Sequence, residues 1–144
     1  DLIDFAIDEL CVDPDRVHVT GHSQGGFLIS TLGCTSADRI TSVAPVAGMR
    51  PAPGGCTPAD AVPLLALHGT DDDVVRYDGG LPPDLARALH LPAGSPSIPD
   101  IVDAWRAEHP GVPVELRTTT GVGHGWPPDA NEQIWAFFSS TWAA

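Results

Sequence analysis

The feature that most constrains this chain is the segment spanning residues 16–27, RVHVTGHSQGGF. It begins with β-branched residues that favour a strand and passes through a Gly-x-Ser-x-Gly pentapeptide centred on Ser23. Apolar residues at helical spacing follow from Phe27 onward. A strand, a tight turn and a helix in this order are the context that lifts a serine hydroxyl above the end of a sheet. We expect Gly21 and Gly25 to be required because larger side chains there would collide with neighbouring elements.

The pentapeptide alone is weak support for chemistry, because a chance match is expected in roughly one chain in twenty of this size. A glycine-rich turn without a catalytic role is the alternative interpretation. The flanking strand and helix favour a nucleophilic Ser23. The helix N-terminus below the turn also offers backbone N–H groups to a developing oxyanion, and the N–H of Gln24 is the donor that can be assigned.

The composition indicates one globular domain over residues 1–144, with 42% hydrophobic and 18% charged residues. The net charge of -12, with seven arginines and no lysine, disfavours nucleic acid and anionic membranes as partners and leaves the oligomeric state open. No apolar run has the length of a transmembrane helix, and the first residues are not a signal peptide. Because the chain starts within a helical pattern and without methionine, we expect it to be a fragment or a processed product.

Hydrophobic periodicity predicts helices that alternate with strands. The expected strands cover residues 16–20, 40–46, 62–68 and 112–119. The expected helices cover residues 2–10, the segment after the turn to about residue 34, residues 83–89, residues 99–109 and a segment that ends near residue 142. Such alternation predicts an α/β fold with a parallel sheet and flanking helices. Ligands of such sheets bind at the carboxyl ends of the strands, where the candidate catalytic residues lie.

A serine nucleophile needs a base within hydrogen-bond reach and an acid that orients the base. His124 is the predicted base because it follows the last strand in a loop with glycines on both sides. His22 adjoins the serine, but we expect its side chain to point away from the turn, and His68 is expected to be a buried structural residue. The remaining alternatives are His18, His90 and His109. The acid is expected among Asp71, Asp72 and Asp73 after the third strand, and spacing alone does not choose between them.

Taken together, these motifs resemble the catalytic half of an α/β-hydrolase of the secreted feruloyl esterase and polyhydroxybutyrate depolymerase group. The matching stretches follow one another in family order across nearly the whole chain: CVDPDRV (11–17), TGHSQGG (20–26), VAPVAG (43–48), HGTDDDVV (68–75), YDGG (77–80), HGWP (124–127) and FF (137–138). The group's pattern His-Gly-Thr-x-Asp-x-Val-Val implies that Asp72 is the catalytic acid and that His124 is the base. The chain departs from the group at Arg76, where a proline is common, and after the helix that contains Trp105, where many relatives have a cysteine.

The resemblance also implies what lies outside this chain. An α/β-hydrolase has about eight strands and carries its nucleophile after the fifth. The expected strands therefore correspond to the fifth through the eighth, and the loop that supplies a second oxyanion N–H is expected to be absent. On this interpretation residues 1–144 form a partial catalytic domain.

The three cysteines, Cys11, Cys34 and Cys56, have no metal-ligand spacing, and the sequence alone leaves open three buried thiols or one disulfide with an odd cysteine. Relatives in the group imply a bridge between Cys11 and Cys34, at the ends of the helices on either side of the first strand. A disulfide implies an oxidising, extracytoplasmic compartment, so the protein is expected to be secreted. Cys56 would then pair outside the chain or stay free.

The expected function is that of a serine carboxylic-ester hydrolase that acts through an acyl-enzyme and needs no metal or organic cofactor. The resemblance implies that the substrates are feruloyl or acetyl esters of plant polysaccharide, or polyhydroxyalkanoate polyester. A peptidase or lipase on the same fold and a non-catalytic binding module are the alternatives. Trp126 and Tyr77 are candidates for an aromatic wall around a feruloyl ring, with ordinary packing as the other interpretation.

Overall fold

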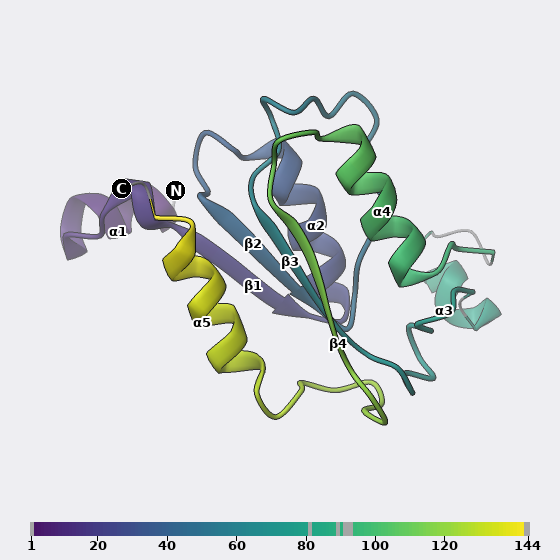
Figure 1. The fold of residues 1–144 in the computed structure, drawn as a ribbon. Helices are drawn as coiled ribbons and strands as arrows, with labels where there is room; N and C mark the ends of the chain where they lie inside the picture. Colours follow the sequence, from purple (N-terminus) through teal and green to yellow (C-terminus); the bar gives the residue numbers. More distant parts are fainter. Residues whose placement is uncertain (1, 81, 89, 91–93, 143–144) are drawn as a thin grey trace.

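The computed structural model describes residues 2–80, 82–88, 90 and 94–142 of the chain. Its elements follow in the order α1 (Leu2–Leu10), the 3₁₀ helix η1 (Pro14–Arg16), β1 (His18–His22), α2 (Gln24–Thr35), β2 (Ser42–Val46), β3 (Leu64–Gly69), α3 (Pro83–Ala88), α4 (Ile98–Glu108), β4 (Val114–Thr119) and α5 (Ala130–Ser140) (Figure 1). Each helix and strand predicted from the sequence has its counterpart here. Leu89, the last residue of the predicted 83–89 helix, lies outside the described residues.

Each strand begins two residues later than the sequence predicted. Pro63 and Pro113 directly precede β3 and β4, and a proline has no N–H to donate to a ladder. Before β1, the side chain of Asp13 accepts a hydrogen bond from the Asp15 N–H at 3.0 Å, and this cap holds the first predicted strand residue in the 3₁₀ helix. The strand then continues to His22, directly before the candidate nucleophile.

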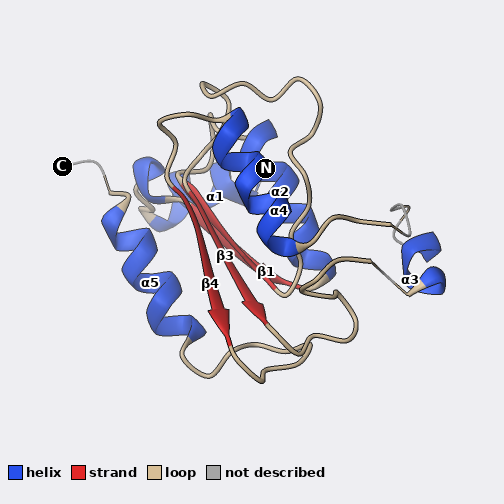
Figure 2. Ribbon diagram, turned by 45° about the vertical axis from the view of Figure 1, so that its right-hand side comes forward, coloured by secondary structure: helices blue, strands red, loops and turns tan. Residues whose placement is uncertain are grey.

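The described strands form one parallel sheet in the order β1-β2-β3-β4. The register pairs His22 with Val46 and Gly69 with Thr119, so the carboxyl ends of the strands lie along one edge. Helices α2 and α4 lie on one face of the sheet and α5 lies on the other (Figure 2). This arrangement confirms the predicted α/β fold with a parallel sheet and flanking helices.

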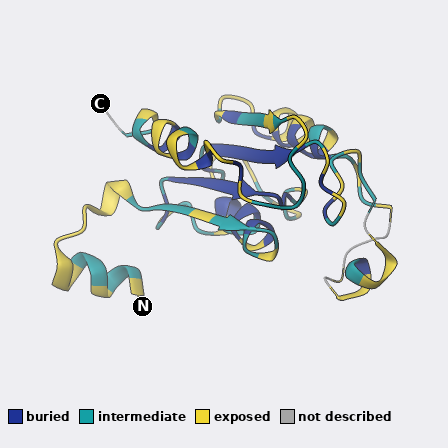
Figure 3. Cartoon of the chain, turned by 90° about the horizontal axis from the view of Figure 1, so that it is seen from below, coloured by how far each residue is buried: buried dark blue, intermediate teal, exposed yellow. Residues whose placement is uncertain are grey.

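The core is divided by the alternation of side chains along the central strands. In β3, Leu64 and Ala66 pack into the apolar cluster under α2 and α4, whereas Leu65 and Leu67 pack into the cluster under α5. Every residue of β2 and β3 is buried (Figure 3). Trp105 of α4 is fully buried in the first cluster. Burial on both faces explains why these strands are continuous apolar runs rather than alternating ones.

Helix α1 lies at the margin of the fold and has no buried residue (Figure 3). Its side chains Leu2, Phe5 and Leu10 are all exposed, although their spacing is that of an amphipathic helix. An ion pair between Asp4 and Arg39 joins α1 to the segment before β2. None of the helices in the described part of the chain combines the length and the apolarity that crossing a membrane would require.

The predicted bridge between Cys11 and Cys34 is wrong, because Cys34 is bonded to Cys56 and Cys11 is an exposed free cysteine. The Val62 N–H donates to the Gly33 carbonyl at 2.9 Å, which folds the loop between β2 and β3 over the end of α2. The Cα atoms of the two bonded cysteines are therefore 5.9 Å apart, within the range of a disulfide. With a sequence separation of 22 residues, the bridge contributes about 3 kcal/mol in the chain-entropy model.

Candidate active site

Ser23 occupies a strained turn between β1 and α2, with φ 57° and ψ -117°. A positive φ is costly for a residue with a side chain, and strain of this kind is characteristic of a nucleophile on a strand-to-helix turn. A Cβ at Gly21 would lie 2.8 Å from the carbonyl carbon of Gly25, which confirms that position 21 must be small. The expected crowding at Gly25 is wrong, because the second close approach is at Gly26, where a Cβ would lie 2.4 Å from the Gly48 carbonyl oxygen.

The backbone around Ser23 is held from both sides. Its N–H donates to the Val46 carbonyl at 2.8 Å, and its carbonyl accepts from the Phe27 N–H at 3.0 Å. Gln24 is the first residue of α2, where an N–H has no acceptor within the helix. The predicted oxyanion donor therefore lies directly after the serine, at the positive end of the helix dipole.

His124 lies between Ser23 and Asp72. Its Nε2 atom is 2.8 Å from Ser23 Oγ, and its Nδ1 atom is 2.9 Å from one carboxylate oxygen of Asp72 and 3.1 Å from the other. Because a carboxylate accepts, Nδ1 carries the proton in neutral imidazole and Nε2 is free to accept from the serine hydroxyl. The structure thus brings the three residues predicted from the sequence together in one hydrogen-bonded chain.

The loop of His124 is fixed by the loop after β3. The Asp71 N–H donates to the Val122 carbonyl at 3.0 Å, and the Gly121 N–H donates to Thr70 Oγ1 at 3.0 Å. A Cβ at Gly69 would lie 2.1 Å from the Val122 carbonyl oxygen, so the two loops make direct backbone contact. This packing sets the distance between the imidazole and the acidic triplet.

Within the acidic triplet, the side chain of Asp72 is fully buried, whereas Asp71 and Asp73 are exposed. The backbone N–H groups of Val74 and Val75 donate to Asp72 Oδ1 at 2.9 and 2.8 Å. Together with the imidazole, these donors satisfy a buried carboxylate and hold it in one orientation. The geometry therefore selects one of the three acids that spacing alone left open.

His68 is buried, as predicted, and it also contacts the carboxylate of Asp72. Its Nε2 atom lies 2.8 Å from the Val75 carbonyl and 3.2 Å from Asp72 Oδ2. Since a carbonyl oxygen only accepts, Nε2 carries a proton that points toward both oxygens. Burial lowers the pKa of His68, although the hydrogen bond to Val75 and the charge of Asp72 oppose this effect. Apart from the four-residue spacing between the two side chains, no feature of the sequence indicated this contact.

The expectation that His22 points away from the turn is wrong, because its ring centroid lies 4.9 Å from that of His124. The strand continues through His22 and places its ring on the side from which the loop before α5 approaches. Its Nε2 atom is buried and has no hydrogen-bond partner among the described residues. Burial, followed by the charge of His124, lowers the pKa of His22, while the charge of Asp72 acts in the opposite direction.

The two aromatic residues proposed to form a wall line separate hollows. Tyr77 borders an acidic hollow with Asp73 and Asp78, and it packs against the cluster under α2 and α4. Trp126 lines a shallow groove over β1 and donates its indole N–H to Asn131 Oδ1 at 2.9 Å. The structure therefore does not join these side chains into one surface.

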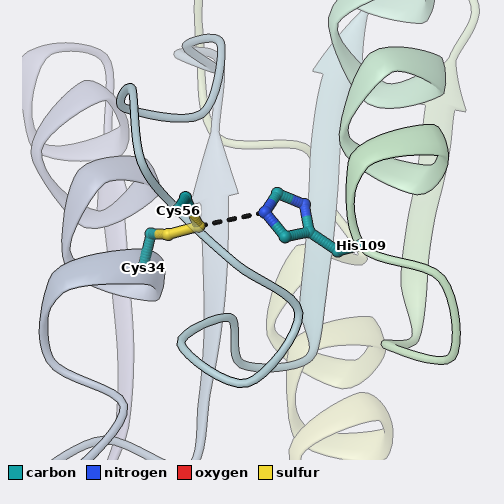
Figure 4. Close-up of side chains that lie close together, drawn as sticks. All are labelled: Cys34, Cys56 and His109. Atoms are coloured by element: carbon teal, nitrogen blue, oxygen red, sulfur yellow. Dashed lines mark hydrogen bonds between the residues drawn. A yellow bond between two sulfur atoms is a disulfide. The ribbon is translucent and has the colours of Figure 1, made fainter.

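One group of potential metal ligands lies within the described residues, away from Ser23. It consists of Cys34, Cys56 and His109, whose Nε2 atom is 3.0 Å from Cys56 Sγ (Figure 4). The Nδ1 atom of His109 lies 2.9 Å from the Trp105 carbonyl and therefore carries the proton. Zinc binds cysteine as thiolate, and the disulfide leaves no thiolate in this group. The arrangement is a disulfide packed against a buried histidine.

The fold is that of the α/β-hydrolases. A truncated carbohydrate esterase from gut microbiota superposes with a TM-score of 0.65 at 14% identity, covering 97% of this chain and 64% of that structure. The esterase PE8 superposes with a TM-score of 0.56 at 20% identity, covering 97% of this chain and 58% of that structure. At these identities the likeness shows the fold.

In sequence the chain is related to curated feruloyl esterases, which confirms that part of the predicted resemblance. Feruloyl esterase B of Piromyces equi is 44% identical over 75 residues, which are 49% of this chain and 14% of that protein. Feruloyl esterase C of Emericella nidulans is 30% identical over 152 residues, covering 91% of this chain and 52% of that protein. The bifunctional acetylxylan esterase/xylanase XynS20E of Neocallimastix patriciarum is 28% identical over 151 residues, covering 96% of this chain and 22% of that protein. The chain thus spans about half or less of these relatives, and no protein-family model matches it.

Proposed function

We propose that the chain carries the catalytic triad of a serine carboxylic-ester hydrolase, with Ser23 as nucleophile, His124 as base and Asp72 as the orienting acid. The observation that carries the proposal is the position of His124, with Nε2 at 2.8 Å from Ser23 Oγ and Nδ1 at 2.9 Å from the Asp72 carboxylate. The strained backbone of Ser23 supports the same assignment.

The reaction proceeds in two steps. His124 Nε2 takes the proton of Ser23 Oγ as the oxygen attacks the ester carbonyl, and the carboxylate of Asp72 stabilises the imidazolium that forms. The Gln24 N–H donates to the developing oxyanion. The imidazolium then protonates the leaving alcohol, and a water molecule activated by the same imidazole hydrolyses the acyl-enzyme.

We assign the substrates to feruloyl or acetyl esters of plant polysaccharide. Support comes from the names of the relatives, which are feruloyl esterases and an acetylxylan esterase. Polyhydroxyalkanoate polyester is the second substrate class, suggested by the motif resemblance. The triad accepts either, because its geometry acts on the ester carbonyl and not on the groups beyond it.

We further propose that the protein works outside the cytoplasm. Its Cys34–Cys56 disulfide supports this location, because disulfides persist in oxidising compartments. Alkylation of the thiols tests whether the bridge is formed. The exposed, free Cys11 is the internal reference, because it reacts with the alkylating reagent whether or not the bridge is present.

The test is covalent labelling of the complete protein with a fluorophosphonate, compared between wild type and Ser23→Ala. We expect a label on the Ser23 peptide of the wild type, hydrolysis of methyl ferulate or acetylated xylan, and loss of both in the variant. A wild type that takes no label and hydrolyses no ester would be a binding module instead. Faster cleavage of a peptide amide than of its matched ester would indicate a peptidase.

A further inference from the structure

A pocket of about 450 Å³ opens between α2, α4 and the loops that follow β2 and β3. We call it the Arg50 pocket and define it by the apolar residues Phe27, Met49, Val75 and Ile98 together with Arg50 and Arg76. The four apolar side chains are all buried and form a continuous hydrophobic wall. A cavity of this size and lining is suited to a small apolar group.

Two arginines have no ion pair among the described residues, and both line the Arg50 pocket. The other five are each paired with a carboxylate: Arg16 with Asp13, Arg39 with Asp4, Arg87 with Asp84, Arg106 with Asp103 and Arg117 with Glu115. Neither Arg50 nor Arg76 has such a partner among the described residues, and no acidic residue lines the pocket. The chain has 19 acidic and seven basic residues, so a site with two cations and no carboxylate differs sharply from the rest of the molecule.

Of the two, Arg50 is the better placed anchor. Its carbonyl accepts a hydrogen bond from the indole N–H of the buried Trp105 at 2.8 Å, which fixes its backbone against α4. Its side chain is half-buried, whereas Arg76 is exposed and also borders the acidic hollow that contains Asp73 and Asp78. Those carboxylates weaken the attraction that Arg76 exerts on an anion, so we expect Arg50 to dominate.

The Arg50 pocket adjoins the proposed triad. The Phe27 N–H bonds the Ser23 carbonyl at 3.0 Å, and the Val75 N–H bonds Asp72 Oδ1 at 2.8 Å. Gly48 directly precedes Met49, and a Cβ there would lie 2.1 Å from the Ser23 carbonyl oxygen. The walls of the pocket are thus built on the residues that hold the nucleophile and the acid.

We infer that the Arg50 pocket selects esters in which an apolar segment ends in a carboxylate, and that Arg50 binds the carboxylate. The inference rests on the proposed esterase function. Arginine binds carboxylate through parallel N–H···O bonds, and the apolar wall would hold the carbon chain or ring between the carboxylate and the ester. A protein with a net charge of -12 repels anions at long range, so acceptance of an anionic ester requires a local cation of this kind.

The kinetic test compares two esters of equal chain length in the complete protein, para-nitrophenyl hexanoate and mono-para-nitrophenyl adipate. We expect Arg50→Gln to lower kcat/KM for the adipate ester about tenfold or more, because it removes a charged hydrogen bond, and to change the hexanoate value less than about twofold. Arg87→Gln removes the same charge from the exposed, ion-paired position on α3 and is the matched control. Equal effects of Arg50→Gln on both esters would exclude a carboxylate site for the acyl half, and the same result for the second pair of substrates would overturn the inference.

A second pair of substrates locates the carboxylate within the ester. Acetate esters of para-hydroxybenzoate and of para-cresol differ by a carboxylate in the alcohol half. If Arg50→Gln loses the preference for the carboxylate-bearing ester of this pair, the inference is supported and the carboxylate lies in the alcohol half. If it loses the preference for the adipate ester over the hexanoate ester, the carboxylate lies in the acyl half. No arginine-dependent preference in either pair would refute the inference.

Binding without turnover separates this inference from the proposed function. Adipic acid monoanilide and hexananilide resist hydrolysis and differ by one carboxylate, and calorimetric titration measures their affinities directly. We expect the wild type and Ser23→Ala to bind the monoanilide about tenfold more tightly than Arg50→Gln does, with hexananilide unaffected. Hydrolysis by Ser23→Ala would contradict the triad and leave this comparison intact. Equal binding of the monoanilide by Arg50→Gln would exclude a carboxylate site for the acyl half and leave the triad intact.

Discussion

The imidazole ring of His22 lies against that of His124, with their centroids 4.9 Å apart. The contact supports the side of the proposed catalytic base that faces neither Ser23 nor Asp72. It leaves His22 Nε2 buried without a hydrogen-bond partner among the described residues, and a buried unpaired nitrogen is costly. The ring of His22 therefore supports His124 by packing against it, whereas the unpaired Nε2 atom lowers the free energy of unfolding.

Two substitutions separate the ring of His22 from its nitrogen. We expect His22→Phe to keep the support for His124, to leave turnover within a fewfold of wild type, and to raise the free energy of unfolding by about 1 kcal/mol. His22→Ala removes the support and should lower turnover about tenfold or more. Denaturant unfolding and steady-state kinetics measure both effects. A destabilised His22→Phe protein would mean that Nε2 has a partner.

Ser23→Ala should lower ester turnover by about 10⁴-fold or more, because the proposed mechanism loses its nucleophile. The far-UV circular dichroism and the unfolding midpoint should stay close to those of wild type, since Ser23 Oγ hydrogen-bonds His124 Nε2 in the part-buried site. Retention of a tenth of the wild-type activity would sink the assignment.

The acidic triplet supplies its own matched controls. Asp72→Asn should lower turnover by about 10⁴-fold, because the imidazole loses the partner that fixes its tautomer. Asp71→Asn and Asp73→Asn should change turnover less than about threefold, since both side chains are exposed. Rates for the three variants on one ester decide the matter, and the largest loss at Asp71 would contradict the geometry.

Much of the fold follows from local signals in the sequence. The alternation of strand and helix patterns predicted the parallel sheet, and the pentapeptide predicted the turn at Ser23. The choice of Asp72 came from a family pattern. In the structure the burial of Asp72 depends on the path of the loop after β3, which the hydrogen bond from the Asp71 N–H to the Val122 carbonyl holds.

The sequence did not indicate contacts that depend on how distant loops cross. The pairing of Cys34 with Cys56 requires the loop before β3 to fold over α2, which the hydrogen bond between Val62 and Gly33 fixes. The tight position at Gly26 depends on where the chain passes after β2. Neither has a signature in residue spacing, because both are set by tertiary packing.

The disulfide should be detectable through the stability of cysteine variants. We expect Cys34→Ser and Cys56→Ser each to lower the free energy of unfolding by about 3 kcal/mol, and Cys11→Ser to change it by less than about 0.5 kcal/mol. Alkylation of the native protein without reductant should label Cys11 and leave the other two cysteines unmodified. A peptide map with a bridge to Cys11 would contradict this pairing.

The burial of His68 predicts that the protein loses stability in mild acid. Burial holds the pKa of His68 below the value of 6.5 that it has in the unfolded chain. Between these two pKa values the unfolded chain binds a proton that the folded chain does not, so the free energy of unfolding rises with pH. Stability is therefore lost as the pH falls from about 7 through about 6.5. His68 contributes a slope of up to about 1.4 kcal/mol per pH unit in that window.

The variant that isolates this effect is His68→Gln, whose amide nitrogen can still donate to the Val75 carbonyl but does not titrate. We expect its free energy of unfolding to depend less steeply on pH than that of wild type between pH about 7 and about 5. His90→Gln, which removes an exposed histidine, is the control for the substitution itself. Urea unfolding at half-unit pH steps measures all three proteins. Asp60 should not contribute to this slope. Hydrogen bonds from Thr57 lower the pKa of its carboxyl, so its contribution to the pH dependence lies at more acid pH. Parallel curves for wild type and His68→Gln would show that His68 binds its proton equally in both states, contrary to its burial beside Asp72.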